Sequence, residues 1–280
     1  MWYGFFFLLL FTGGGLNQLK PFLKIMTLLF SPLEQFEILP LLSLNLGFLD
    51  LSITNQTILL LLITFFIVTL FLSSLKQSDS SLFIASHRWQ AVLEMVYSLV
   101  LNIVIDTIKS KSAQLYFPLI FTLFFFIASM NLIGLIPYSF TVTSHMVVTL
   151  TLSLSIFIGI NIICVRVHKL EFFSLFLPSG TTLALAFLLV PLEIISYIFR
   201  PLSLAIRLFC NMMAGHTLLK VFAGFAWTLM SFSGILFFMH YLPLLILLPL
   251  YGLELGISLI QAFVFSLLTC MYLNDAINLH

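Results

Sequence analysis

The chain has 280 residues, of which 61% are hydrophobic and only 8% are charged. Because soluble domains carry roughly 25% charged residues, this composition excludes an ordinary soluble protein and predicts an integral membrane protein. Leu, Phe and Ile dominate the long apolar runs without strict alternation, which favours an all-α fold over a lipid-facing barrel. The formal net charge of +1 gives no reason to expect nucleic acid as a partner.

The chain begins with a segment that predicts no confident span. In residues 1–50, prolines and scattered charges interrupt short apolar pieces, so we interpret them as a lead-in. Residues 51–280 are expected to form a single membrane domain. It opens with 51–75, a segment without any formal charge. About 20 apolar residues cross a bilayer, so this segment predicts the first transmembrane helix.

The segment 76–111 has a different character, because charged side chains stand among apolar residues that recur at helical intervals of three and four. Such an amphipathic pattern is typical of a helix that lies along the membrane surface. A short span with charged ends is the alternative, and the periodicity leaves it open.

Residues 115–167 predict a helical hairpin of two spans, 115–137 and 146–165, joined by a short polar turn. Lys and Arg are distributed unevenly around it. The segments 76–111 and 166–169 hold six of the eleven, and the turn holds none. By the positive-inside rule, both basic segments face the cytoplasm or matrix and the N-terminus lies on the opposite side.

The last part of the chain, 178–275, contains two apolar stretches, about 181–227 and about 234–272, that are longer than one crossing requires. A helix of ~45 residues would be roughly 68 Å long, about twice the hydrocarbon core of a bilayer. Each stretch is therefore either two spans or one long, tilted or bent helix, with Pro191 and Pro201 as bending points in the first. We expect about three lipid-spanning helices, one amphipathic surface helix and two long, tilted C-terminal helices.

Arg207 is a cation in the first long stretch, with no acidic residue within nine positions on either side. A charged residue at the centre of a membrane helix costs ~2.5 kcal/mol or more, so an unpaired arginine there indicates function. Along a regular helix, Glu193 lies roughly 21 Å and His216 roughly 13 Å from Arg207, so neither can be its ion-pair partner. Glu193, Arg200 and Asn211 share a face with Arg207, whereas His216 points the other way.

Glu254 and Gln261 lie two turns apart on one face of the second long stretch. Glu254 could neutralise Arg207, pair with His216 or titrate alone, and the sequence leaves these alternatives open. If Glu254 binds Arg207, the site is structural. If it does not, the anion that pairs with Arg207 must come from another chain or from a ligand.

Several other polar residues have simpler interpretations. Arg200 and Lys220 can extend their long stems to the lipid headgroups. Cys164, Cys210 and Cys270 stand alone in apolar runs and are interpreted as packing residues. Their spacing indicates neither a disulfide framework nor a metal site, and we expect no cofactor.

Six segments together resemble subunit a of the F-type ATP synthase, in its mitochondrial form, over most of residues 31–280. They are SPLEQFEI (31–38), RWQ with the following Glu94, NLIGLIPYSFTVTSH (131–145), PLEIISYIFRPLSLAIRLFCNMMAGH (191–216), LELGISLIQAFVF (253–265) and YLNDAINLH (272–280). Residues 1–30 carry none of the resemblance.

The resemblance implies a role for each matching residue. Arg207 falls on the family's essential arginine, which faces a rotating ring of c subunits and interacts with their proton-carrying carboxylates. Asn211 and Gln261 match polar residues near that arginine. His216 and Glu254 match the pair that the mitochondrial form places in the half-channel on the intermembrane-space side.

Two further positions carry implied roles in proton movement. Glu193 matches the acidic residue of the matrix half-channel. Asn131 matches a polar position near the entry side. The implied function is that of a stator subunit with two offset proton half-channels, which Arg207 separates.

The resemblance also implies partners and a location. The partners are the c-ring, other membrane and peripheral-stalk subunits of the ATP synthase, lipid and protons, and no nucleic acid. The location is the mitochondrial inner membrane, crossed several times, with the N-terminus toward the intermembrane space and the C-terminus toward the matrix. The subunit would itself be non-catalytic.

Two other classes of protein remain as alternatives. A secondary transporter could bind an anionic substrate at Arg207, but such proteins often have repeated halves, which this sequence lacks. A structural membrane subunit could bury Arg207 and Glu254 as a pair. An enzyme is not indicated, because no nucleophile, metal cluster or phosphate-binding loop is evident.

Overall fold

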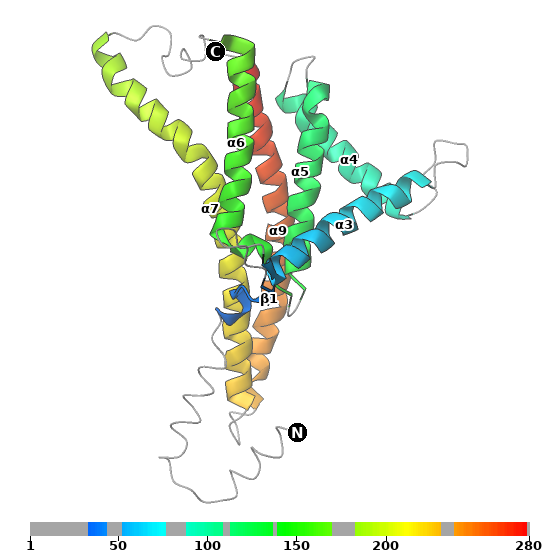
Figure 1. Ribbon diagram of the computed structural model, residues 1–280. Coiled ribbons are helices and arrows are strands. Elements are labelled where there is room, and N and C mark those ends of the chain that lie inside the picture. The colour runs from blue at the N-terminus through cyan, green and yellow to red at the C-terminus, as the bar shows by residue number, and fades with distance from the viewer. Residues whose placement is uncertain are drawn as a thin grey trace, which may run out of the picture.

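Long helices dominate the chain, as the computed structural model shows (Figure 1). The structure describes residues 33–43, 52–76, 88–108, 113–136, 139–169, 183–230 and 238–278. Within these ranges, six helices are long and apolar enough to cross a membrane. They are α3 (Asn55–Lys76), α4 (Arg88–Thr107), α5 (Ala113–Gly134), α6 (Met146–His168), α7 (Leu183–Met230) and α9 (Tyr241–Ile277). The predicted all-α membrane protein is confirmed.

A few short elements precede and connect these helices. The 3-10 helix η1 (Glu34–Phe36) and the strand β1 (Pro40–Leu42) lie in the predicted lead-in, of which 1–32 and 44–50 are outside the described residues. β1 pairs antiparallel with β2 (Ile53–Thr54) just before α3. The 3-10 helix η2 (Val142–Ser144) lies between α5 and α6. The strand pair was not predicted from the sequence.

The shorter helices fall close to the segments expected from the apolar runs. α3 matches the predicted first span, and α5 and α6 match the two arms of the predicted hairpin. α4 lies within 76–111, where an amphipathic helix was expected. That α4 lies along the membrane surface stays a prediction, because this helix also has the length and composition of a span.

The two long stretches are each one continuous helix, and not a pair of spans. α7 has 48 residues and α9 has 37, which correspond to roughly 72 Å and 56 Å at 1.5 Å per residue. Pro191 and Pro201 lie inside α7 without ending it. The first half of α7 leans away from the bundle, and the second half runs beside α9 (Figure 1). The predicted start of the second stretch, near Gly234, is outside the described residues.

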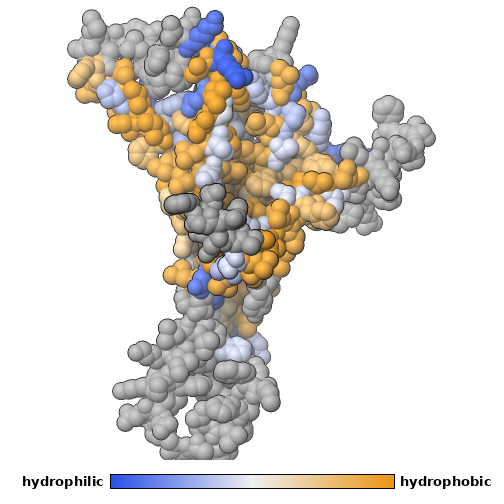
Figure 2. Space-filling model, in the orientation of Figure 1, coloured by the Kyte–Doolittle hydropathy of each residue, from blue (hydrophilic) through white to orange (hydrophobic). Residues whose placement is uncertain are grey.

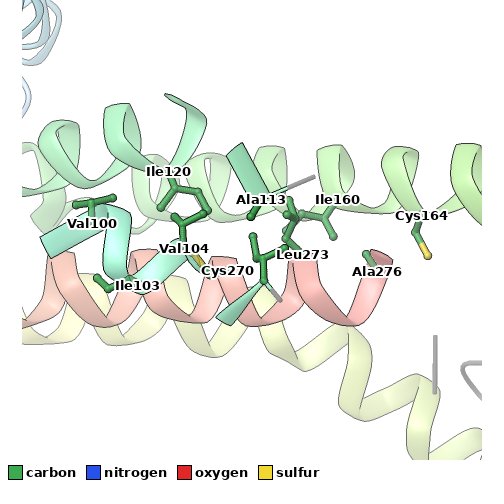
Figure 3. Close-up of a cluster of buried hydrophobic side chains, with 11 residues drawn as sticks. Val100, Ile103, Val104, Ala113, Ile120, Ile160, Cys164, Cys270, Leu273 and Ala276 are labelled. Carbon is green, nitrogen blue, oxygen red and sulfur yellow. The ribbon is translucent and has the colours of Figure 1, made fainter. Parts of the chain in front are cut away.

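The helix α9 is at the centre of the bundle, because it packs against α4, α5, α6 and α7. One buried cluster joins α4, α5, α6 and α9 (Figure 3). A second cluster joins α3, α5, α7 and α9 around Phe265, Leu208 and Ile127. The face seen in Figure 2 is mostly apolar, with hydrophilic side chains gathered near the end of α6, and many large apolar side chains of the described helices are exposed. Such a surface suits a lipid environment.

The three cysteines do not share one environment. Cys164 and Cys270 are buried in the first cluster, which confirms their interpretation as packing residues. Cys210 is exposed on α7, so the same interpretation was wrong for it. This exposure could not be predicted, because α7 is apolar nearly all round and its periodicity does not indicate which face packs.

An aromatic ladder attaches α3 to the bundle, and Phe121 of α5 is its central ring. The ring of Phe121 lies 5.6 Å from that of Phe71 on α3, 5.7 Å from that of Tyr97 on α4, and 4.9 Å from that of Phe125, between centroids. Such pairs contribute about 0.5–1.5 kcal/mol each beyond the area they bury. The ladder therefore holds α3 at its angle to α5.

Replacing Phe121 by Ala is expected to loosen α3, because one substitution removes several ring contacts at about 3–5 kcal/mol in total. The measurement is the distance distribution between spin labels at Leu62 and Thr122, two exposed positions on α3 and α5. It should broaden in Phe121→Ala. It should not change in Phe65→Ala, whose ring is 70% exposed. Equal broadening in both variants would contradict this role of the ladder.

Candidate functional site

Polar contacts between α7 and α9 define the candidate site. Three of them follow one another in opposite order along the two helices, which run antiparallel. Arg200 pairs with Asp275 at 3.3 Å, and Asn211 Nδ2 donates to Gln261 Oε1 at 3.0 Å. Gly215 lies against Glu254, because a Cβ added to Gly215 would be 2.7 Å from Cδ and 2.9 Å from Cγ of that side chain.

Arg207 lies on α7 between the first two of these contacts. Its side chain is exposed and makes no hydrogen bond or ion pair with any described residue. Ser203, Cys210 and Ala214 are exposed at helical spacing on the same side. We call these three residues and Arg207 the exposed stripe. Leu204, Leu208 and Met212 are buried on the opposite side of α7, so the stripe faces away from the bundle.

Glu254 is the buried carboxylate of the site, with 5% of its surface exposed. Neither carboxylate oxygen has a hydrogen-bond partner in the described part of the chain. Its contact residue, Gly215, is roughly 12 Å along α7 from Arg207. Of the alternatives that the sequence left open, neutralisation of Arg207 by Glu254 is therefore wrong. A structural unit that buries Arg207 and Glu254 as a pair is excluded with it.

His216 follows the glycine that touches Glu254 and is half-buried. Its Nε2 atom is buried and has no hydrogen-bond partner among the residues described. The structure brings His216 to the level of Glu254 on α7, but no hydrogen bond joins the imidazole to the carboxylate. The described ranges also contain no group of three metal-binding side chains.

Two hydrogen bonds join α9 to α5 and to the residue that follows α5, one on either side of Glu254. Asn131 is fully buried, and its Nδ2 donates to the Ser258 carbonyl at 3.3 Å. The Tyr251 hydroxyl donates to the Leu135 carbonyl at 3.4 Å. Asn131 was a candidate from the sequence, whereas Tyr251 was missed. The polar spacing Tyr251, Glu254, Ser258 along one face of an apolar helix could have indicated it.

More polar side chains gather at η2, near the same end of the site. Thr141 and Thr143 are buried, and their hydroxyl oxygens have no partner among the described residues. A Cβ on Gly134 would lie 3.0 Å from Thr141 Cγ2 and 3.7 Å from Met212 Cε, so this loop contacts α7. Buried polar atoms are normally paired with protein or with ordered water, so water is the expected partner here.

His145 ends the loop and stacks on Phe140, with 5.1 Å between ring centroids. Burial lowers the pKa of His145 below its ordinary value. The imidazole is therefore neutral at pH 7. It adds polarity to this end of the site without adding charge.

Glu193 lies on the leaning half of α7, on the other side of Arg207 from Glu254. It is half-buried and makes no hydrogen bond with a described residue. The structure thus brings together Asn131, Asn211, His216, Glu254 and Gln261 near the middle and one end of the α7–α9 contact. It does not bring Glu193 to them.

Arg200 was interpreted from the sequence as extending to the lipid headgroups, but in the structure it contacts side chains of α7 and α9. Beside its pairing with Asp275, the guanidinium lies 5.3 Å from the ring centroid of Tyr197 and 5.5 Å from that of Tyr272. Tyr197 in turn donates a hydrogen bond to Asn161 Oδ1 on α6. Sequence reasoning missed this cluster. The sequence feature that could have indicated it is a tyrosine three residues before the charged residue on each helix, Tyr197 before Arg200 and Tyr272 before Asp275.

A family model and the similar proteins from several organisms all carry the name of one ATP synthase subunit. A model of the family described as ATP synthase A chain matches residues 57–274. ATP synthase subunit a of Marchantia polymorpha is 51% identical over 252 residues, 89% of this chain and 99% of that protein. The proteins of the same name from Pylaiella littoralis and Brassica napus are each 50% identical, over 89% of this chain and 99% and 97% of their own lengths.

The contact between Gly215 and Glu254 predicts opposite effects for two equivalent substitutions on α7. Gly215→Ala forces a buried side chain to move, so we expect a loss of about 1–3 kcal/mol in stability. Gly224→Ala meets no atom within 4 Å and should gain about 0.5–1 kcal/mol, because Ala favours helix over Gly. The measurement is the temperature of half-aggregation in detergent. Shifts of the same sign would contradict the close contact.

Proposed function

The chain belongs to the family of the ATP synthase A chain, and from this membership we propose that it is the membrane-sector stator subunit that conducts protons to and from a rotating ring of c subunits. The observation that carries the proposal is the exposed position of Arg207 on α7. No described residue of this chain supplies its anion. The anion is then expected from a neighbouring chain.

The small side chains of the exposed stripe support a close neighbour. Ser203, Cys210 and Ala214 flank Arg207 and let another helix approach closely, as small residues do at helix contacts in membranes. A ring of two-helix subunits, each with a membrane carboxylate, fits this surface. Each carboxylate would come within reach of the guanidinium as the ring turns.

Arginine suits this position because it stays protonated at any working pH and never becomes a proton carrier. Its charge favours the ionised form of a carboxylate that approaches it, so the carboxylate releases its proton before passing. The same charge repels protons and blocks direct leakage between the two sides. Arg207 thus separates the entry and exit paths.

The entry path is assigned to Glu254 and His216, with the buried polar groups around Asn131 and η2 leading to them. In support, these residues lie together on one side of Arg207 and carry polar atoms that lack protein partners in the described ranges. Buried carboxylates in membrane proteins usually line water or a proton relay. Asn211 and Gln261 bond to each other between this path and Arg207.

The exit path is assigned to Glu193. It lies on the opposite side of Arg207, roughly 21 Å away along α7. A proton entering past His216 and Glu254 would load a ring carboxylate, travel with the ring and leave past Glu193. Two offset paths of this kind need no connection inside the chain, and the reaction needs no catalytic residue or cofactor from it.

The proposal includes a location and an orientation. The chain is a membrane protein, and we assign it to the mitochondrial inner membrane, crossed several times. The N-terminus would face the intermembrane space and the C-terminus the matrix. The support is the distribution of Lys and Arg, together with the mitochondrial character of the matching segments.

Replacing Arg207 by Ala tests the proposal. We expect ATP synthesis by the reconstituted enzyme to fall at least about 100-fold, with passive proton leak, because the barrier between the paths is lost. Arg207→Lys should also fail, since lysine keeps the charge but loses the planar fork of donors. The matched control is Lys220→Ala, a cation of the same helix without an assigned role. Tightly coupled synthesis in Arg207→Ala would refute the proposal.

A further inference from the structure

Arg200 raises an electrostatic difficulty for the proposed function. It lies two turns before Arg207 on α7, roughly 10.5 Å away and within about 20° of the same face on a regular helix. A second uncompensated cation at this distance would also attract the carboxylates that Arg207 is proposed to meet. With an effective dielectric constant of about 20, a unit charge 10 Å away shifts a proton equilibrium by about one pH unit.

The structure compensates the charge of Arg200 within this chain. Arg200 Nη1 lies 3.3 Å from Asp275 Oδ2, and the two side chains are 30% and 43% exposed. The residues are 75 positions apart, so this pair depends on the antiparallel register of α7 and α9. Only one nitrogen of the guanidinium contacts the carboxylate, so the pair is not bidentate. Two aromatic rings also hold the guanidinium in position.

Two tyrosines and an asparagine hold the guanidinium in place. Tyr197 and Tyr272 present their ring faces to Arg200 from α7 and α9. Tyr197 is itself anchored, because its hydroxyl donates to Asn161 on α6. The pair lines a small recess with Phe157 and Ala276. Contact with ring faces and with a carboxylate strengthens as water is removed.

The groups that face Arg200 can be named for each packed element. From α9 they are Asp275 and Tyr272, and from α7 they are Tyr197 and, two turns earlier, Glu193. From α6 the recess is lined by the uncharged Phe157 and Ile160, and Asn161 bonds to Tyr197. On a regular helix Arg200 and Arg207 are roughly 10.5 Å apart on nearly the same face. A carboxylate that meets Arg207 is therefore also within reach of the field of Arg200, whose ion-pair partner among the described residues is Asp275.

We propose that Asp275 neutralises Arg200 so that Arg207 is left as the uncompensated cation facing the moving carboxylates. Asp275 is a positioning residue in this scheme and carries no proton. The inference rests on the proposed function of Arg207. It adds that the charge of Arg200 must be neutralised for Arg207 to be the cation that acts on the carboxylates.

The proposal makes a directional prediction for Asp275→Asn. With Arg200 uncompensated, a passing carboxylate is held in its ionised form more strongly, and a lower pH is needed to protonate it. The pH of half-maximal ATP synthesis on the entry side should fall by about one unit, and the rate at a fixed entry pH should fall about tenfold. A purely structural defect would lower the rate without moving this pH.

The decisive comparison is the double variant Arg200→Gln, Asp275→Asn, which removes both charges. It should restore the pH of half-maximal synthesis and bring the rate to within about threefold of the unmodified enzyme. All variants are assayed as the intact ATP synthase in vesicles, and the amount of this chain in the purified complex is measured. Asp106→Asn, an exposed carboxylate on α4, is the matched control and should change neither value.

Three outcomes would overturn the proposal. Asp275→Asn could behave like the unmodified enzyme. The double variant could be no better than Asp275→Asn, which would make the carboxylate itself essential, as a proton relay. If Asp275→Asn does not assemble, Asp275→Glu, which keeps the charge, must be active and the double variant must assemble and work. Failure of either variant is the third outcome that would overturn the proposal. Arg207→Ala tests the proposed function separately, since every variant above keeps Arg207.

Discussion

The guanidinium of Arg207, which has no partner among the described residues and lies on a helix surface that otherwise suits lipid, is the constraint on which the rest of this structure depends. A cation in such surroundings is stable only where a carboxylate or water reaches it. Burial of Leu204, Leu208 and Met212 on the other side of α7 fixes the direction in which Arg207 points. The fold thus points Arg207 away from the bundle, where a partner from another chain can reach it.

The helix α9 positions the other polar residues of the site relative to Arg207. It packs against four helices and carries Asp275, Gln261 and Glu254, which meet α7 at three successive levels. Both helices are long and continuous, so a single alignment of α7 with α9 determines all three contacts. The Arg200–Asp275 ion pair, the Asn211–Gln261 hydrogen bond and the buried Glu254 therefore lie at fixed distances from Arg207. The hydrogen bonds Asn131–Ser258 and Tyr251–Leu135 tie this register to α5 and to the residue that follows it.

The sequence predicted what depends on composition and on isolated polar residues. Apolar runs located α3, α5, α6 and α7 to within a few residues. Arg207 and Glu254 were evident because a charge in such a run is rare. The packing partners could not be predicted, because Arg200 and Asp275 are 75 positions apart and α7 is apolar nearly all round. For the same reason, the exposure of Cys210 and the contact of Glu254 with Gly215 required the structure.

The most direct test of the central claim uses the native thiol of Cys210, which lies one turn from Arg207 on the exposed stripe. The other two cysteines are buried, so a short crosslinker should react selectively at this position. In the intact enzyme, it should join Cys210 to a cysteine placed one turn from the membrane carboxylate of a c subunit, and Cys210→Ser should abolish the product. Crosslinking of Cys210 only to lipid or to subunits outside the ring would contradict the account.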